Sequence, residues 1–422
     1  MGNLIKKLTE PNLPSDYFRM EVPILRYLGI EMLRDETVGY RVFSLVSLFN
    51  MVVIFLGLEI YELFVQFNLE KFSKPTINVA NYAITHAMGT IELMLMYINR
   101  KKIGKIMTSL HNPPFAPDAS RSGSSESRWI RETVLITEIV YIVFSIFLFI
   151  TITSIFLECL YFCIVKPRDE WEMPFAPMSI GAFQKEWPIF EISVVYQLFE
   201  IIAFAYITLT SYLLMSAITA HIGIQFRIMA NSLRTLKSRA KQQAGADRDN
   251  ETIVNKNMEV LMRSYIKHHL DVLNLAEEME SLCSLMILFI FLFSVLLMCF
   301  ILFFASLEPI GSVEFFHFFF YWWCIACQIG SYCYWGNELS DESEKIAQAA
   351  AEIDWIGSSK IITFAVQMII TRAQQPVYIT AGKFVPLSMP TLMMLVKGSF
   401  SYFMVLKQTQ DENELRQLTE IS

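Results

Sequence analysis

The chain has 422 residues, of which 54% are hydrophobic and only 18% are charged, and its mean hydropathy is +0.41. A soluble protein of this length carries about a quarter charged residues, so the composition argues against a soluble globular protein and predicts a polytopic membrane protein. The formal net charge of −7 says little by itself, but lysine and arginine form no continuous stripe beside aromatic residues. We therefore expect no nucleic-acid partner.

Seven apolar segments are long enough to cross a lipid bilayer, which requires ~20 predominantly apolar residues. The second is the most polar, because it contains Asn78, Asn81, His86 and Glu92. We therefore predict an all-α polytopic membrane protein with seven transmembrane helices. The seven segments are residues 42–64, 76–98, 134–157, 189–216, 282–305, 315–336 and 384–406.

Lysine and arginine are distributed unequally between the two sides of these spans. Of the 34 basic residues, 26 precede span 1 or lie between spans 2 and 3, 4 and 5, or 6 and 7, whereas 7 lie on the opposite side and Lys397 lies within the last span. Positively charged loops stay in the cytoplasm. The N-terminus is therefore predicted to be cytoplasmic and the C-terminus extracellular, the reverse of a G-protein-coupled receptor.

Aromatic residues are concentrated in the half of the spans that is predicted to be extracellular. Residues 315–323 read FFHFFFYWW and cover every face of a helix, so some of them must point inward. We predict a pocket for a small apolar ligand here, with ordinary membrane-core packing as the alternative. Its candidate lining residues are Tyr82, Phe149, Tyr196, Phe199, Phe318, Tyr321 and Trp322.

Helical patterns also continue beyond the spans on the predicted cytoplasmic side. Apolar residues in segment 255–281 recur in steps of three and four, which predicts a helix of about 27 residues and ~40 Å that extends span 5. Segment 337–376 contains two more helical patterns. Such apolar faces must be buried, so we expect packing within the chain and between subunits in an anchor bundle. The candidate anchor residues are Met258, Leu261, Tyr265, Val272 and Leu275.

The motifs of the common enzyme classes are missing from the sequence. It contains no phosphate-binding loop, HExxH, GxSxG, kinase set or dinucleotide fingerprint. Cys324 and Cys327 form a CxxC on an apolar helix, where small buried hydrophobic residues are the better interpretation. We therefore expect no enzymatic activity, no cofactor and no metal, which leaves a receptor, a channel or a transporter.

Three stretches resemble the insect odorant receptor family, and the resemblance extends over nearly the whole chain. They are HIGIQFRIMANSL, YWGNELSDESEKIAQAAAEIDW and QQPVYITAGKFVPLSMPTLMMLVKGSFSYFMVL. The resemblance implies a non-selective cation channel that a small volatile odorant opens without a G protein. It also implies a tetramer in which the last span lines a central pore and the cytoplasmic helices form a common anchor.

The last span carries the residues that this resemblance assigns to the pore. Val405 matches the narrow hydrophobic gate of the family, Gln408 matches the polar position outside it, and Ser401 lies one turn inward on the same face. Lys407 is unexpected beside a cation pathway. The family also places its ligand site among spans 2, 3, 4 and 6, and members often carry an acid in span 4 where this chain has 210–212.

The short loop between spans 4 and 5 favours a ligand-tuned subunit over the longer co-receptor. Such a subunit is expected in the plasma membrane of olfactory sensory neurons, in a heterotetramer with the co-receptor or, less commonly, in a homotetramer. A gustatory receptor is the alternative within the same architecture, although Ser401, Tyr402 and Gln408 only half satisfy its closing signature. A secondary transporter is a further alternative, but the two halves show no self-similarity.

These inferences predict seven regions along the chain. They are a cytoplasmic N-terminal segment (1–41), spans 1–4 with their loops (42–254), the cytoplasmic extension of span 5 (255–281), spans 5 and 6 (282–336), the anchor helices (337–376), the pore helix (377–408) and an extracellular tail (409–422).

Overall fold

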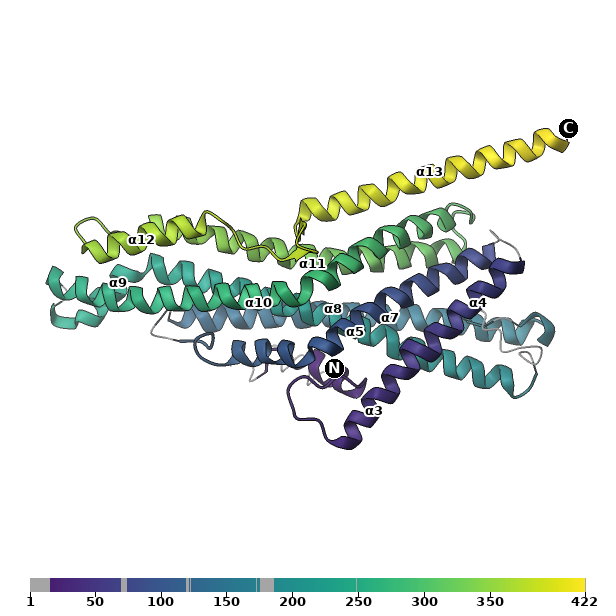
Figure 1. The fold of residues 1–422 in the computed structure, drawn as a ribbon, viewed down its shortest axis with the longest axis horizontal. Helices are drawn as coiled ribbons and strands as arrows, with labels where there is room; N and C mark the ends of the chain where they lie inside the picture. The colour runs from purple at the N-terminus through teal and green to yellow at the C-terminus, as the bar shows by residue number, and fades with distance from the viewer. Residues whose placement is uncertain are drawn as a thin grey trace.

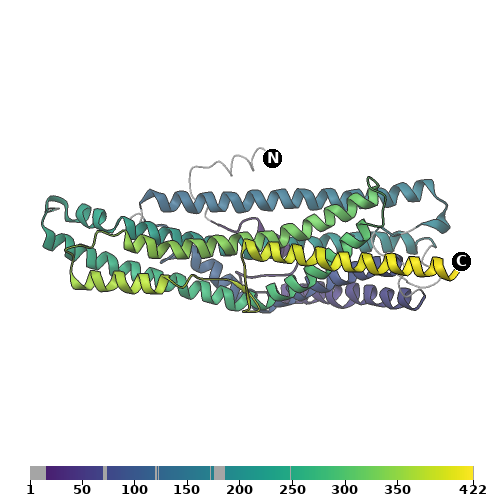
Figure 2. The same ribbon diagram turned by 90° about the horizontal axis from the view of Figure 1, so that it is seen from above.

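The described part of the chain is an elongated, mostly helical bundle (Figure 1). The computed structural model describes residues 16–69, 74–118, 121, 123–171, 173–174, 186–247 and 249–421. The helices run along the longest axis, with α9 and α12 at one end, which we call the anchor end (Figure 1). The last helix, α13, begins near the middle of the bundle and runs to the other end in both views (Figures 1 and 2).

The elements follow one another in a simple order, and each long helix carries one predicted span. The helices are α2 (Glu21–Tyr27), α3 (Val38–Phe49), α4 (Leu56–Leu69), α5 (Lys74–His111), α7 (Ser124–Val165), α8 (Ile189–Arg234), α9 (Leu236–Ala244), α10 (Glu251–Ala305), α11 (Val313–Ala351), α12 (Lys360–Ala373) and α13 (Met389–Ile421). Strands β1 (Thr380–Ala381) and β2 (Val385–Pro386) form a hairpin before α13.

The helical membrane-protein prediction is confirmed. Among the described residues, five helical stretches are long and apolar enough to cross a membrane; four contain the first, third, fourth and fifth predicted spans, and the last contains most of the seventh. The second and sixth predicted spans lie in α5 and α11, which have 38 and 39 residues but are more polar. A π-helical turn, Asn50–Phe55, joins α3 to α4 within the first span.

The last helix begins later than its sequence suggests. We expected the span to start at residue 384, whereas α13 starts at Met389. The preceding residues form the hairpin instead, because Gly382 and Lys383 adopt positive φ angles of 61° and 63° that turn the chain. The side chain of Ser388 then accepts a hydrogen bond from the Thr391 backbone N–H at 3.3 Å and caps the new helix.

The centre of the bundle is α8, which packs most extensively against α11 and also against α7 and α10. Nearly every residue between 203 and 233 is buried, as expected for a helix that is apolar on all sides. Because α8 is enclosed in this way, it fixes the relative positions of the third, fifth and sixth predicted spans.

The seam along α10 is buried inside the chain itself. The predicted continuous helix is confirmed, since α10 runs unbroken for 55 residues. We expected its seam to pack between subunits as well, but the five seam side chains are only 0–8% exposed within one chain, so no surface remains on them for a second chain. These residues are Met258, Leu261, Tyr265, Val272 and Leu275.

Helix α13 is mostly uncovered. Only 11% of its most apolar window is buried, although α13 is one of the five membrane-length helices. Met393, Met394 and Val405 are each more than half exposed. An apolar helix with this much free surface must be covered by lipid or by other chains.

Candidate functional site

The predicted ligand region is built around Tyr321 on α11. The Tyr321 hydroxyl forms a short hydrogen bond with the Thr85 hydroxyl on α5, and Tyr82 lies almost one turn before Thr85 on the same helix. Phe318 stacks on Phe304 of α10 with ring centroids 5.5 Å apart. The region therefore joins α5, α10 and α11 through aromatic rings and one pair of hydroxyl groups.

Of two more predicted residues, Trp322 lies at the edge of this group, whereas Tyr196 packs in a separate cluster with Phe55 and Phe190. Trp322 packs edge-to-face against Phe400 of α13, with centroids 6.2 Å apart. The Tyr196 hydroxyl on α8 donates to the Asn50 side chain at 3.2 Å, so Tyr196 faces the first span. Contact between Trp322 and Phe400 connects the predicted ligand region directly to the last helix.

The remaining two predicted residues lie on the outside of the chain. Phe149 on α7 is 63% exposed and Phe199 on α8 is 66% exposed. Their depth in the membrane matches that of the other candidates, but depth does not determine the face of the helix on which a side chain lies. The structure therefore does not bring Phe149 and Phe199 into the aromatic group within one chain.

The structure also reveals buried polar contacts that the sequence prediction omitted. The Nδ1 atom of His86 lies 2.7 Å from the Glu59 carboxylate, and both side chains are less than 10% exposed. The Asn50 amide donates a short hydrogen bond to Glu200 on α8. Ionisable residues inside membrane spans are costly and commonly functional. Glu59 in the first predicted span and Glu200 in the fourth could therefore have been recognised in the sequence as candidate functional residues.

The predicted pore residues share one face of α13. Ser401, Val405 and Gln408 are spaced by four and three residues, which aligns them along a helix. All three side chains are exposed, and 59% of Val405 is accessible. Lys407 is exposed as well, on an adjacent part of the helix.

The hairpin ties α13 to the bundle. The Gly382 N–H donates to the Ser284 carbonyl of α10 at 2.8 Å, and the Lys383 N–H donates to the Ser284 hydroxyl at 2.9 Å. The Thr380 hydroxyl donates to Glu280 on the same helix at 2.5 Å. The hairpin therefore links α10 to the beginning of α13 through backbone and side-chain hydrogen bonds.

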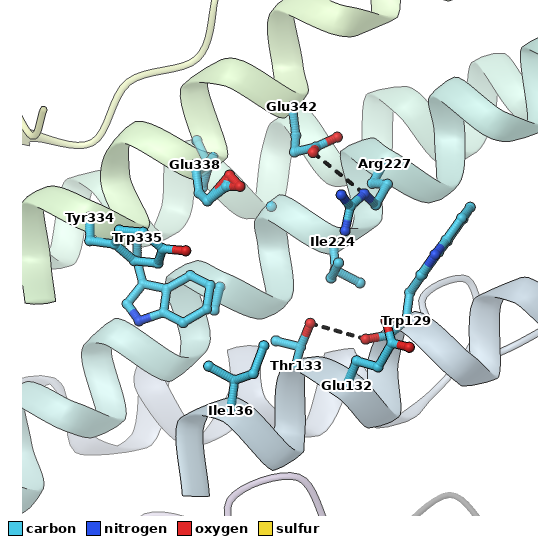
Figure 3. A pocket seen from close by; sticks show the side chains of 13 residues that line it. Trp129, Glu132, Thr133, Ile136, Ile224, Arg227, Tyr334, Trp335, Glu338 and Glu342 are labelled. Atoms are coloured by element: carbon cyan, nitrogen blue, oxygen red, sulfur yellow. Dashed lines mark hydrogen bonds and ion pairs between the residues drawn. The ribbon is translucent and has the colours of Figure 1, made fainter. Parts of the chain in front are cut away.

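A cavity of about 190 Å³ lies between α7, α8 and α11 (Figure 3). Trp129 and Glu132 of α7, Arg227 of α8, and Trp335 and Glu338 of α11 are among its lining residues. Sequence reasoning did not identify this cavity, because its residues come from three helices that are far apart in the chain.

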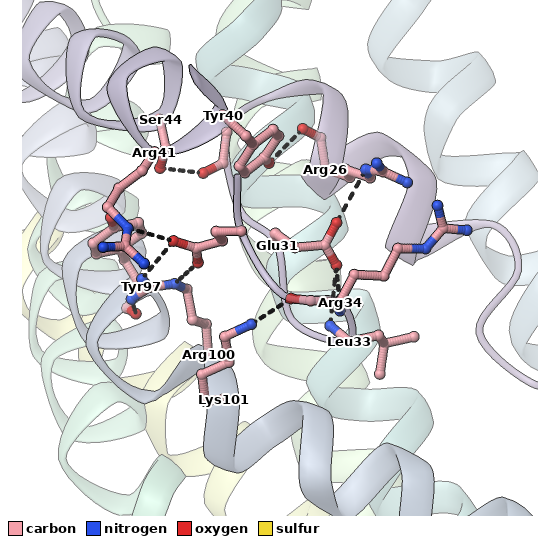
Figure 4. Close-up of polar contacts among 12 residues, drawn as sticks. Arg26, Glu31, Leu33, Arg34, Tyr40, Arg41, Ser44, Tyr97, Arg100 and Lys101 are labelled. Atoms are coloured by element: carbon pink, nitrogen blue, oxygen red, sulfur yellow. Dashed lines mark hydrogen bonds and ion pairs between the residues drawn. The ribbon is translucent and has the colours of Figure 1, made fainter. Parts of the chain in front are cut away.

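The segment before α3 is fixed to the first two spans by polar contacts (Figure 4). Arg100 of α5 donates to Glu36 at 2.8 Å and 3.3 Å, and this guanidinium holds the pKa of Glu36 below its usual value. Glu31 pairs with Arg26 at 3.0 Å and accepts two backbone N–H groups. These contacts give the N-terminal segment a defined position against α5.

A buried ion pair holds the 2–3 connection against α10. Arg121 donates to both oxygens of Glu126 at 2.8 Å, and the two side chains are 7% and 0% exposed. Arg121 also lies 3.0 Å from His268 Nδ1, and its carbonyl accepts from the Tyr265 hydroxyl at 3.3 Å. The seam residue Tyr265 and its neighbour His268, both on α10, therefore contact a residue from another part of the chain.

Comparisons with known proteins agree on one family. A family model described as "7tm Odorant receptor" matches residues 75–400. Odorant receptor 67a of Drosophila melanogaster is 22% identical over 407 residues, which is 93% of this chain and 95% of that protein. Putative odorant receptor 92a of the same species is 27% identical over 209 residues, so the chain spans about half (48%) of that relative.

Solved structures show the same fold. The insect olfactory receptor OR5 from Machilis hrabei, in complex with eugenol, matches with a TM-score of 0.77 and 16% identity over 93% of this chain and 98% of that chain. A second structure of OR5 matches with a TM-score of 0.74 over 97% and 98% of the two chains. At 16% identity, these matches establish the architecture rather than the ligand.

Proposed function

The chain belongs to the seven-transmembrane odorant receptor family, and from this premise we propose that it is a subunit of an odorant-gated, non-selective cation channel. The family consists of ligand-binding receptors rather than enzymes, which confirms the prediction that the chain is not an enzyme. Its match to the odorant receptor model also favours this family over the gustatory receptor and transporter alternatives.

The uncovered helix α13 is the observation that carries the channel proposal. Between Met389 and Gln410 its free surface includes the apolar side chains of Met393, Met394 and Met404, and Ser401 and Gln408 lie on the face that also holds Val405. Four copies of such a helix around a symmetry axis would cover one another and leave this face towards a central path. A ring of Val405 side chains would exclude water when narrow and permit hydrated cations when wide.

The proposed ligand is a small, volatile, largely apolar odorant bound beside Tyr321. Tyr82, Phe318 and Trp322 provide aromatic surface, and the Thr85 and Tyr321 hydroxyls provide hydrogen-bonding groups at one place. OR5 of Machilis hrabei binds eugenol, a ligand of this class. Phe149 and Phe199 belong to the proposal only as contacts to lipid or to a neighbouring subunit, because both are largely exposed.

The proposed gating route follows the packing of α10, α11 and α13. An odorant that binds the open state more tightly than the closed state shifts the population towards the open state. Trp322 contacts Phe400 directly, and the hairpin joins Ser284 to the start of α13. A displacement of α10 or α11 therefore reaches Val405 along two independent connections.

The proposed assembly is a heterotetramer with co-receptor subunits in the plasma membrane of olfactory sensory neurons, with the N-terminus in the cytoplasm. A homotetramer remains the alternative. Because the α10 seam is buried within the chain, contacts between subunits at the anchor end must use exposed side chains. Examples are Val260 on α10 and Phe364 and Met368 on α12.

The test is a recording of whole-cell current from cells that make this chain alone and together with the co-receptor, during application of a broad odorant panel and with G-protein signalling blocked. A rapid cation current only with the co-receptor is the expected result. Current from the chain alone would support a homotetramer. Silence under both conditions, despite expression at the cell surface and a panel that activates related receptors, would contradict the proposal.

A further inference from the structure

The cavity between α7, α8 and α11 has the composition of a headgroup site (Figure 3). We propose that it binds the zwitterionic headgroup of a membrane phospholipid, with the lipid phosphate at Arg227 and the lipid ammonium at Glu338. This site is separate from the proposed odorant region, because none of its lining residues belongs to the aromatic group around Tyr321. It does not depend on whether the channel proposal is correct.

The charges around the cavity balance. Its lining contains three carboxylates, Glu132, Glu338 and Glu342, and one cation, Arg227. Glu132 pairs with Arg128 at 2.8 Å and Glu342 pairs with Lys345 at 3.0 Å. The lining residues together with these two partners thus carry three negative and three positive charges. A neutral arrangement suits a zwitterion better than an anionic or a cationic ligand.

Two of the charged groups are available to a ligand. No hydrogen-bond or ion-pair partner of Glu338 is present among the residues that the structure describes, and Glu338 is partly buried at the cavity wall. Arg227 lies 3.4 Å from Glu342, whose closer partner is Lys345. The Arg227 side chain is 46% exposed, so its guanidinium can form further hydrogen bonds, and guanidinium groups match phosphate oxygens in geometry.

The walls of the cavity are aromatic where an ammonium group would lie. Trp335 and Tyr334 come from the same turn of α11 as Glu338, whereas Trp129 of α7 lies at the opposite end of the cavity, beside Arg227 (Figure 3). Aromatic faces attract ammonium groups by cation–π interaction. The Arg227 guanidinium lies 5.9 Å from the centroid of the Trp129 ring, at the end of the cavity that we assign to the phosphate.

The cavity lies at the depth where lipid headgroups are expected. Trp129 and Glu132 directly precede the third predicted span, 134–157, and Trp335 and Glu338 lie at the end of the sixth, 315–336. Both ends belong to the side of the membrane that the basic residues predict to be cytoplasmic. Tryptophan and tyrosine are enriched at this interface. The leaflet that supplies the lipid is therefore the inner one.

An apolar track leads from the cavity along α7. Ile136 lines the cavity and is 48% exposed, and the following positions on the same helix face are also about half exposed. Their spacing of three and four residues keeps them in one line. An acyl chain of the bound lipid can lie along this line while its headgroup occupies the cavity. The residues of the track are Ile136, Ile139, Val143, Ile146 and Ile150.

The test uses the purified full-length chain in detergent and native mass spectrometry, with two added lipids that have the same acyl chains. One is phosphatidylethanolamine, which is zwitterionic, and the other is phosphatidylglycerol, which lacks the ammonium. We expect severalfold greater retention of phosphatidylethanolamine. Glu338→Gln should remove this preference, whereas Arg227→Gln should reduce retention of both lipids, since both have a phosphate.

Matched controls separate the site from general lipid binding. Glu277 is an exposed carboxylate on α10, outside the cavity, so Glu277→Gln should behave as the unchanged chain. Glu338→Asp keeps the charge and should preserve part of the preference. This variant distinguishes loss of the carboxylate from a folding defect caused by any substitution at position 338. Equal retention of the two lipids by the unchanged chain, or an unchanged preference in Glu338→Gln, would overturn the proposal.

Soluble phosphoethanolamine distinguishes a lipid from a free headgroup. The apolar track predicts that the acyl chains contribute to binding, so phosphoethanolamine at concentrations similar to the lipid should not displace it. Displacement at similar concentrations would mean that the cavity takes a free metabolite of the same chemistry and would overturn the assignment to a membrane lipid.

Discussion

Gly336 of α11 lies directly against Leu387, the residue that precedes Ser388 and the start of α13. A β-carbon at position 336 would lie 2.4 Å from the Leu387 β-carbon and 3.0 Å from its carbonyl oxygen. Only glycine permits this approach, because any side chain would push the hairpin and the first turn of α13 away from α11. The pair thus sets how closely the connection before α13 can approach the bundle.

Gly336→Ala adds only one methyl group but should strongly impair folding or channel function. Overpacking of this kind costs about 1–3 kcal/mol, and here the strain falls on the connection to α13. We expect reduced surface expression or a reduced maximal odorant current. Gly330→Ala on the same helix is the control, since a β-carbon there would meet only a Leu392 methyl group at 3.8 Å. Equal currents from both variants would show that Gly336 is not required for the close approach of the connection before α13.

Val405→Ala and Gln408→Ala should each change ion permeation. If these side chains line the narrowest path, removing their bulk or polarity alters the relative permeability of cations or the sensitivity to pore blockers. The measurement is the reversal potential under bi-ionic conditions. Met404→Ala is the control, because Met404 is 60% exposed on a neighbouring face of α13. Unchanged permeation in both pore variants would show that this face is not the pore lining.

Tyr321→Ala should lower odorant sensitivity without removing the protein from the cell surface. The substitution deletes an aromatic ring and the hydroxyl that bonds to Thr85. A tenfold increase in the half-maximal odorant concentration corresponds to about 1.4 kcal/mol of lost binding free energy. Phe320→Ala, at an adjacent position that is 46% exposed, should have little effect. Equal shifts in the two variants would argue against a pocket beside Tyr321.

Arg121→Met should destabilise the folded chain by about 3–5 kcal/mol, because it leaves the buried Glu126 carboxylate without its partner. The expected result is a clearly lower unfolding temperature of the detergent-solubilised protein. Arg234→Met breaks an exposed pair with Glu352 at 2.7 Å and should change the unfolding temperature little, because water screens exposed ion pairs. Similar unfolding temperatures for the two variants would contradict the importance of the buried pair.

Glu21→Gln should stabilise the protein near neutral pH. Burial is the main cause that raises the pKa of Glu21 from 4.5 to about 8, so the folded chain holds a proton that the unfolded chain releases. Stability from this group is complete below pH 4.5 and declines as the pH rises towards 8. The loss reaches up to about 3 kcal/mol at pH 7.

The measurement for Glu21 is the unfolding temperature between pH 4.5 and 9. The unchanged chain should lose stability across the interval from pH 4.5 to 8, and Glu21→Gln should show a flatter profile over the same interval. Parallel profiles for the two proteins would mean that Glu21 titrates normally in the folded chain.

The sequence by itself determined the helical architecture. Apolar length and helical periodicity are local properties, so each predicted span and the continuous 55-residue α10 could be identified without knowledge of their neighbours. Three stretches of the sequence also indicated the family, and the match of the odorant receptor family model to residues 75–400 agrees with them. The start of α13 was missed, because the hairpin before it depends on contacts with Ser284 of α10.

Only the tertiary structure decided which face of each helix points inward. Phe149 and Phe199 have the depth and chemistry of ligand contacts, yet both lie on the outside, whereas Glu59 and Glu200 lie inside with polar partners. The seam of α10 has the pattern of an inter-subunit zipper but is buried within one chain. Periodicity shows that a helix has a buried face, and only the positions of the neighbouring helices determine what covers it.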